Sequence, residues 1–220
     1  MSDTTDVDSI SPETETAPQQ IIEFWFGQGA EAIVTDRNAL WFGANAEIDN
    51  AIQSRFGQLI SAAERGELNH WQSSAVPSLA LIILLDQFTR NVYRGSERAF
   101  ASDHLALAVC QAGLADNFDK ALTPSQRAFY YLPLEHAEDL ACQQRSVALF
   151  EALAAEVAAS HGKQAAEIFA GTKQYADEHH DIIARFGRFP HRNALLDRQS
   201  TAEELAFLDA GGQTFGQSSN

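Results

Sequence analysis

The sequence predicts an all-α fold of about eight helices packed as antiparallel pairs. Three observations support this prediction. Apolar residues recur at a helical period, as in Ile48, Ile52, Phe56 and Leu59. Threonine followed three positions later by glutamine or glutamate, the spacing of a helix capping box, occurs twice before such segments. No stretch of useful length alternates between apolar and polar residues, as a half-buried strand would.

The composition fits one domain and argues against two classes of partner. The 220 residues are enough to bury a sizeable core, and 45% of them are hydrophobic. There are 30 acidic and 15 basic residues, so the net charge is −15. Such a chain lacks the broad basic surface that nucleic acids and anionic membranes attract. We therefore expect no nucleic-acid partner and no membrane partner.

The two ends of the chain are expected to lie outside the folded domain. Residues 1–17 contain five acidic residues and no basic one, which predicts a disordered acidic tail. We expect one helical domain over residues 18–215 and a flexible tail over residues 216–220. The chain starts without a secretory leader, its longest apolar run has seven residues, and its two cysteines make no disulfide framework. These features predict a soluble cytoplasmic protein.

The first three helices are predicted from apolar faces and from their start and stop residues. Pro18 can occupy a first helical turn, so a helix is expected to begin there and to end near Gly27. A second helix is expected from Ala46 to Gly66. Residues 76–93 contain the run LALIILL and stay compatible with a helix to their end. They predict a central helix that is buried on most sides.

Five further helices are expected in the C-terminal half. They span about residues 98–113, the segment after Thr123, about residues 135–160, about residues 163–186, and the segment that begins at Thr201. Thr123 and Thr201 each open a capping box. Pro133 is expected to break or kink the helix that contains it.

Three polar stretches interrupt this apolar framework. Residues 86–95 read DQFTRNVYRG, residues 132–140 read LPLEHAEDL, and residues 185–193 read RFGRFPHRN. We expect them to form one cleft near the end of the central helix. The residues expected to bind a ligand there are Asp86, Gln87, Arg90, Asn91, Arg94, Glu135, His136, Glu138, Asp139, His179, Arg185, Arg188, His191, Arg192 and Asn193.

The residue types in this cleft leave three functions open. Arginine forks suit phosphate or carboxylate, which favours a binding protein for an anionic small molecule or peptide. The second function is a metal-dependent or acid–base hydrolase acting on a phosphorylated or carboxylated small molecule. Its catalytic candidates are His136 with Asp139, three positions later, as an oriented acid–base pair, and His191 as a proton donor. In the third, the acidic residues 135–139 pair with the arginines, so that the cluster is a structural clamp in a protein-interaction scaffold.

The sequence predicts no metal and no cofactor. A di-metal site in a helical bundle needs two E-x-x-H pairs, and only Glu67 and His70 have that spacing. His180 and Asp181 form a dyad like that of metal-dependent HD phosphohydrolases, but one such dipeptide is weak support for a metal site. His179 lies on an apolar helix face. It is either a core histidine bonded to a carboxylate or carbonyl group, or a ligand contact.

The polar stretches also carry a resemblance to a known family. DQFTRNVYRG, LPLEHAEDL and RFGRFPHRN, in this order and with EFWFG near the start, resemble the bacterial family called domain of unknown function 924. The resemblance covers about residues 21–215 and implies a tetratricopeptide-like helical fold, but it implies no activity. The chain departs from the usual family pattern at Thr89, where the family has proline, and at Asp197, where it has glycine.

Overall fold

The protein is all-α. Its structure is a computed structural model that describes residues 12–28 and 33–216. Within these residues, eight helices have seven or more residues and no strand occurs, which confirms the predicted fold class. The tetratricopeptide-like arrangement that the resemblance implied stays a prediction.

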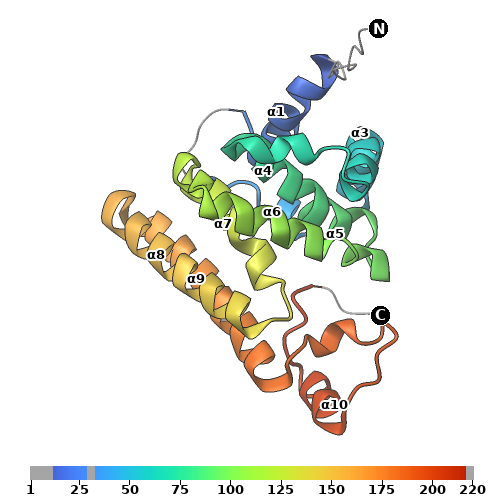
Figure 1. The fold of residues 1–220 in the computed structure, drawn as a ribbon. Coiled ribbons are helices and arrows are strands. Elements are labelled where there is room, and N and C mark those ends of the chain that lie inside the picture. Colours follow the sequence, from blue (N-terminus) through green and yellow to red (C-terminus); the bar gives the residue numbers. More distant parts are fainter. Residues whose placement is uncertain (1–11, 29–32, 217–220) are drawn as a thin grey trace, which may run out of the picture.

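The N-terminal helices are α1 (Pro12–Phe26), α2 (Asn38–Phe42) and α3 (Ala46–Glu64). Figure 1 shows α1 at the top of the molecule, above α4. α1 contains Pro18 and begins six residues before it, within the tail predicted over residues 1–17, so the helix start predicted at Pro18 is wrong. Ala17 is buried in the core, and this burial offsets the hydrogen bond that Pro18 cannot donate. The rest of that predicted tail, and residues 217–220, lie outside the described residues.

A buried central helix is present, but its middle is wider than an α-helix. It consists of α4 (Ala75–Ile82), a π-helical segment (Ile83–Phe88) and α5 (Thr89–Val92). Every residue from 78 to 91 is buried. The hydroxyl of Thr89 donates to the Leu85 carbonyl at 2.9 Å. Since π-helical turns recur at functional sites, this segment indicates where a site would lie.

The C-terminal half contains α6 (Asp103–Ala115), α7 (Pro124–Glu135), α8 (Leu140–Ser160), α9 (Gly162–Phe186) and α10 (Ala202–Asp209). Short 3₁₀ turns lie at residues 69–73, 97–99, 118–121 and 190–192. Both predicted capping boxes are present. Pro133 does not end α7, which continues to Glu135, and α8 begins only at Leu140 rather than near residue 135. The reason is Asp139, whose carboxylate caps α8 by accepting from the Cys142 amide at 2.8 Å.

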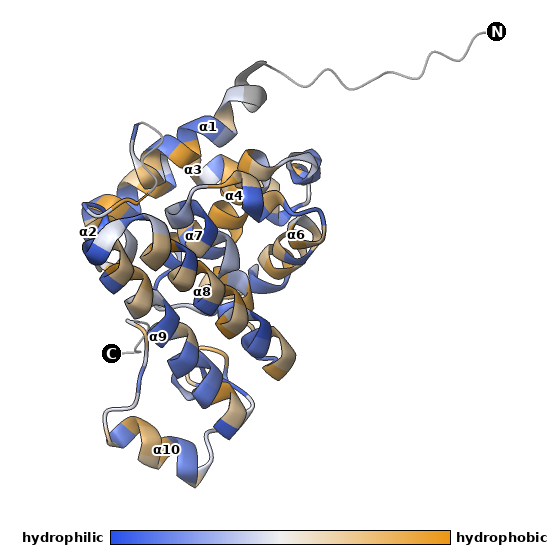
Figure 2. Ribbon diagram, turned by 90° about the vertical axis from the view of Figure 1, so that its left-hand side faces the viewer, coloured by the Kyte–Doolittle hydropathy of each residue, from blue (hydrophilic) through white to orange (hydrophobic). Residues whose placement is uncertain are grey.

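The helices share one large core beside a long helical hairpin. α8 and α9 lie side by side and antiparallel, separated only by His161 (Figure 1). Trp25, Phe88 and Tyr130 are among the largest fully buried side chains. Hydrophobic residues concentrate around α4 in the middle of the molecule, whereas α9 and α10 alternate between hydrophilic and hydrophobic (Figure 2). In the described part of the chain, no helix combines the length and the apolar character that crossing a membrane requires.

Candidate functional site

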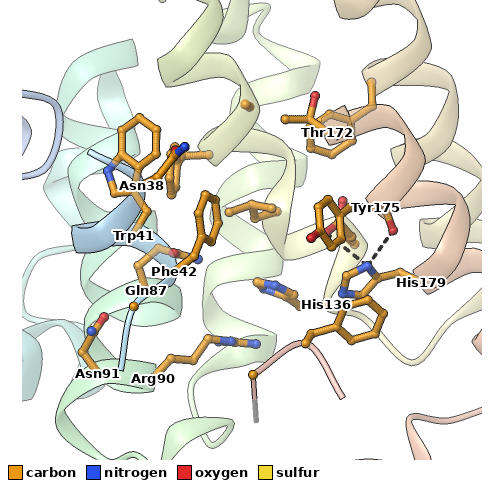
Figure 3. Close-up of a pocket in the computed structure, with 18 of the residues that line it drawn as sticks. Asn38, Trp41, Phe42, Gln87, Arg90, Asn91, His136, Thr172, Tyr175 and His179 are labelled. Atoms are coloured by element: carbon orange, nitrogen blue, oxygen red, sulfur yellow. Dashed lines mark hydrogen bonds and ion pairs between the residues drawn. The ribbon is translucent and has the colours of Figure 1, made fainter. Parts of the chain in front are cut away.

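A pocket of about 520 Å³ lies between α2, the central helix, α7 and α9. Figure 3 shows Trp41 and Phe42 of α2 on one side, Tyr175 and His179 of α9 on the other, and His136 between them. The pocket has two kinds of wall. The aromatic wall consists of Trp41, Phe42, Phe129, Phe150, Phe169 and Phe215. The polar floor consists of Gln87, Arg90, Glu135, His136, His179 and Arg192.

Asp86 does not line the pocket, but it contacts the polar floor and fixes the orientation of His136. It is fully buried on the π-helical segment, and its Oδ1 lies 2.7 Å from Nδ1 of His136 and 3.0 Å from Nη1 of Arg90. Burial raises the pKa of Asp86, but the charge of Arg90 and the hydrogen bonds from His136 and Gln87 outweigh burial and hold this pKa below its ordinary value. The carboxylate is therefore ionised and accepts from His136 Nδ1–H. Burial and the charge of Arg90 lower the pKa of His136 below its ordinary value, so the ring is neutral near pH 7 and its Nε2 keeps a lone pair.

His179 is oriented in a similar way by a backbone carbonyl. Its Nδ1 donates to the Tyr175 carbonyl at 2.8 Å, because a carbonyl can only accept. Phe215 stacks on the imidazole, with ring centroids 3.6 Å apart and planes at 15°. Burial and the neighbouring His136 lower the pKa of His179 well below its ordinary value. The ring is therefore neutral, and its Nε2 also keeps a lone pair.

Glu135 is a buried carboxyl group that has no lysine or arginine partner among the described residues. Its side chain is 5% exposed, and its Oε1 lies 3.3 Å from Nδ1 of the neutral His179. Burial and then the charge of Asp86 raise the pKa of Glu135 to about 8. In this structure Glu135 is thus protonated at neutral pH, unless a cation joins it.

The arginines of the polar floor are balanced by carboxylates. Arg90 donates two parallel hydrogen bonds to Asp103, at 2.8 and 2.9 Å. Arg192 donates to the same carboxylate at 3.4 Å and to the His136 carbonyl at 3.1 Å. Burial lowers the pKa of Arg192 to about 10, so it stays charged at neutral pH. Its Nε is buried and has no hydrogen-bond partner among the described residues.

Nine of the fifteen residues expected to bind a ligand line this pocket. They are Gln87, Arg90, Asn91, Arg94, Glu135, His136, His179, His191 and Arg192. Residues from all three polar stretches therefore meet here. Arg94 and Asn91 both donate to Asp49 of α3, which ties the pocket edge to that helix.

The other six expected residues do not line the pocket, and most of them are held by partners elsewhere. They are Asp86, Glu138, Asp139, Arg185, Arg188 and Asn193. Arg185 and Arg188 pair with Glu203 and Glu204 of α10. Asn193 donates to Glu204, and Glu138 pairs with Arg198. Glu138 therefore does hold the C-terminal segment, but through Arg198 and the Phe189 amide and not through the arginines of residues 185–193. Arg185 and Arg188 hold α10 instead.

Two of the three catalytic candidates have surroundings that do not suit the predicted role. Asp139 caps α8 and is not the partner of His136, whose carboxylate partner is Asp86. Burial and the charge of Arg192 lower the pKa of His191 to about 3. A histidine that is neutral at physiological pH is a poor proton donor.

Sequence reasoning missed the aromatic wall and Asp103. The aromatic residues fall on apolar helix faces, which a periodicity pattern assigns to the core. Asp103 is the first residue of α6 and resembles any acidic residue at a helix start. An arginine-rich cluster in an acidic chain was the only signal for a buried carboxylate partner, and it did not indicate which one.

These features define the class: an all-α protein with an amphipathic pocket of the size that small ligands occupy. The sequence model of a family described as "Bacterial protein of unknown function (DUF924)" matches residues 21–212, so the chain belongs to this bacterial family. A solved structure of a protein of unknown function from Agrobacterium tumefaciens is 38% identical, with a TM-score of 0.75, over 90% of this chain and 99% of that chain. No curated protein matches the chain.

Proposed function

We propose that this is a cytoplasmic binding protein for an amphipathic small molecule. The apolar part of the ligand packs against the aromatic wall, and its anionic head, a carboxylate or phosphate, sits on the polar floor at Arg192. The observation that carries this proposal is a pocket in which an aromatic wall adjoins a floor that carries Arg90 and Arg192. A guanidinium group that lines a pocket can donate charge-assisted hydrogen bonds to a carboxylate or phosphate.

The entrance to the pocket supports an apolar ligand chain. Phe42 is 72% exposed and Tyr175 56%, and both line the pocket. Covering large apolar side chains on a surface with another apolar group is favourable, because it removes apolar area from water. A ligand chain that leaves the pocket between α2 and α9 would cover both.

Isothermal titration with decanoate, decanol and decylamine tests the proposal. We expect decanoate to bind at least about tenfold more tightly than decanol, because a charge-assisted hydrogen bond contributes roughly 1.5–3 kcal/mol. Decylamine should not bind. Equal affinity for the three molecules, or no binding of decanoate, would contradict the proposal.

Two arginine variants complete this test. Arg192→Gln should reduce the affinity for decanoate to that for decanol. Arg185→Gln is the matched control, since Arg185 is exposed, pairs with Glu203 and does not line the pocket. If Arg192→Gln does not fold, as judged by circular dichroism, Arg192→Lys keeps the charge and should retain the preference for decanoate while weakening it.

A hydrolase is the second candidate, and the Asp86–His136 pair favours it. A carboxylate that accepts from Nδ1 leaves Nε2 of the imidazole as a general base, and His136 lines the pocket. The expected result is hydrolysis of p-nitrophenyl esters or phosphates that His136→Gln abolishes. Turnover that survives this substitution would assign the activity to a contaminant and remove this candidate.

A further inference from the structure

We propose that Glu135, His136 and His179 bind a divalent transition metal ion, with Zn²⁺ as the best match, at the polar floor of the pocket. One nitrogen of each imidazole and one oxygen of the carboxyl group all lie within 4.8 Å of one another. Two histidines and one glutamate are a ligand set of zinc sites that keep a position open for a further ligand. Oε1 of Glu135 lies 3.3 Å from Nδ1 of His179, so Glu135 would change its rotamer to meet a metal ion held by Nε2 of that ring.

The hydrogen bonds behind the two histidines have the pattern that metal sites require. A metal-binding imidazole usually donates its other ring N–H to a carboxylate or a backbone carbonyl. His136 donates to Asp86, and His179 donates to the Tyr175 carbonyl. Each pairing fixes the tautomer that leaves Nε2 free to bind a metal. Phe215, stacked on His179, further restrains that ring.

The charges around the cluster also favour a cation. Arg90 and Arg192 are balanced by Asp86 and Asp103. Glu135 is left over, buried, without a lysine or arginine partner among the described residues. A divalent ion would give this carboxylate the partner it lacks and would add one net positive charge to the polar floor.

That remaining charge links the metal to the ligand. His136 and His179 both line the pocket, so an open coordination position would face it. The anionic head of the ligand would then be the fourth metal ligand, beside Arg192. This last step rests on the proposed function, whereas the metal site itself does not.

The sequence did not indicate this site because no spacing typical of a metal-binding motif joins its ligands. Glu135 and His136 are neighbours in the chain, and His179 is far from both. Neighbouring residues normally point to different faces of a helix. Glu135 is the last residue of α7, and His136 is its C-cap. His179 meets them from α9, with its ring centroid 6.1 Å from that of His136 (Figure 3).

Metal titrations of the untagged, chelator-treated protein test the site. We expect one Zn²⁺ per chain by isothermal titration, an increase in melting temperature, and the visible absorption of tetrahedral Co²⁺ when Co²⁺ replaces zinc. Glu135→Gln should weaken Zn²⁺ binding at least 100-fold, and it keeps the size of the side chain. His180→Gln is the matched control on the same helix, because His180 is outside the cluster. Its affinity should equal that of the wild type.

Several results would overturn the inference. They are less than one-tenth of a Zn²⁺ per chain, no tetrahedral Co²⁺ spectrum, or equal affinity of Glu135→Gln and the wild type. The titration of decanoate into metal-free and zinc-loaded protein separates the two proposals. Tighter binding to the zinc-loaded protein supports the metal-bound head. Equal binding contradicts that step and leaves the proposed function standing, while metal binding without decanoate binding contradicts the proposed function alone.

Discussion

Asp86 is fully buried and yet ionised, because Arg90 and His136 lie within 3.0 Å of its Oδ1. At the scale of single residues, this carboxylate organises the polar floor. It orients His136, and the amide of Gln87 donates to its other oxygen. The cost of burying the carboxylate is offset by three donors, a network in which each member depends on the others.

Asp197 is the second residue whose local geometry has a measurable consequence. Its φ of 50° lies in the left-handed region, which favours glycine. We predict that Asp197→Gly raises the free energy of unfolding by about 0.5–1 kcal/mol, because glycine adopts this conformation without strain. Urea denaturation measures the change. Asp197→Ala should have the opposite sign, and equal effects of the two variants would show that backbone strain is not the cause.

Residue-scale prediction from sequence succeeded for composition and failed for pairing. The clustered arginines, His136 and Asp86 were recognisable as polar groups in an apolar framework. Local spacing suggested Asp139 as the partner of His136, but the actual partner lies 50 positions away in the chain. A pattern over a few residues carries no information about such a contact.

α10 is docked by ion pairs, and this determines its behaviour at the scale of elements. Arg188 donates two hydrogen bonds to Glu204, at 2.6 and 2.8 Å, and Glu204 also caps α10 through the Thr201 amide. The hydrogen bonds from Arg188 lower the pKa of Glu204 from 4.5 to about 2. The ionised form is thus favoured in the folded state.

The pH dependence of this pairing is predicted from the sign of the pKa shift. Because the pKa of Glu204 is lower in the folded state, its ionised carboxylate stabilises the fold above about pH 4.5. This stabilisation is lost as the pH falls toward about 2. Glu204→Gln should therefore lower the free energy of unfolding by about 2 kcal/mol near neutral pH. The difference from the wild type should narrow steadily below pH 4.5. Urea denaturation at several pH values measures it.

Glu203→Gln is the control for this prediction. Glu203 pairs with Arg185, but the two side chains are 63% and 52% exposed. An exposed pair contributes less than about 1 kcal/mol. A Glu203 variant as unstable as the Glu204 variant, or a Glu204 effect that does not change with pH, would contradict the account of α10.

At the scale of the whole molecule, distant segments meet in one pocket. α2 supplies the exposed part of the aromatic wall. The π-helical segment and the end of α7 contribute to the polar floor, and α9 closes the opposite side (Figure 3). The helix periods and capping boxes predicted most of these elements. They did not predict where the elements meet, because a face that lines a pocket and a face that packs in the core have the same apolar pattern.

The prediction at the scale of the whole molecule concerns Phe42, the exposed residue of the aromatic wall. Phe42→Ser should weaken the binding of decanoate about tenfold, since a ligand chain loses an apolar surface to cover. The melting temperature should hardly change, because Phe42 is 72% exposed. Leu205→Ser, on α10 and outside the pocket, is the control and should bind decanoate normally. A normal affinity of the Phe42 variant would place the ligand chain elsewhere.

The most direct test of the central claim, that the pocket binds an amphipathic anion, is a crystal structure from crystals grown with decanoate. The account predicts a carboxylate within hydrogen-bond distance of Arg192 and an alkyl chain along Trp41, Phe42 and Phe169 in the pocket. Decanoate bound only on the outer surface, or an empty pocket at saturating decanoate, would contradict it.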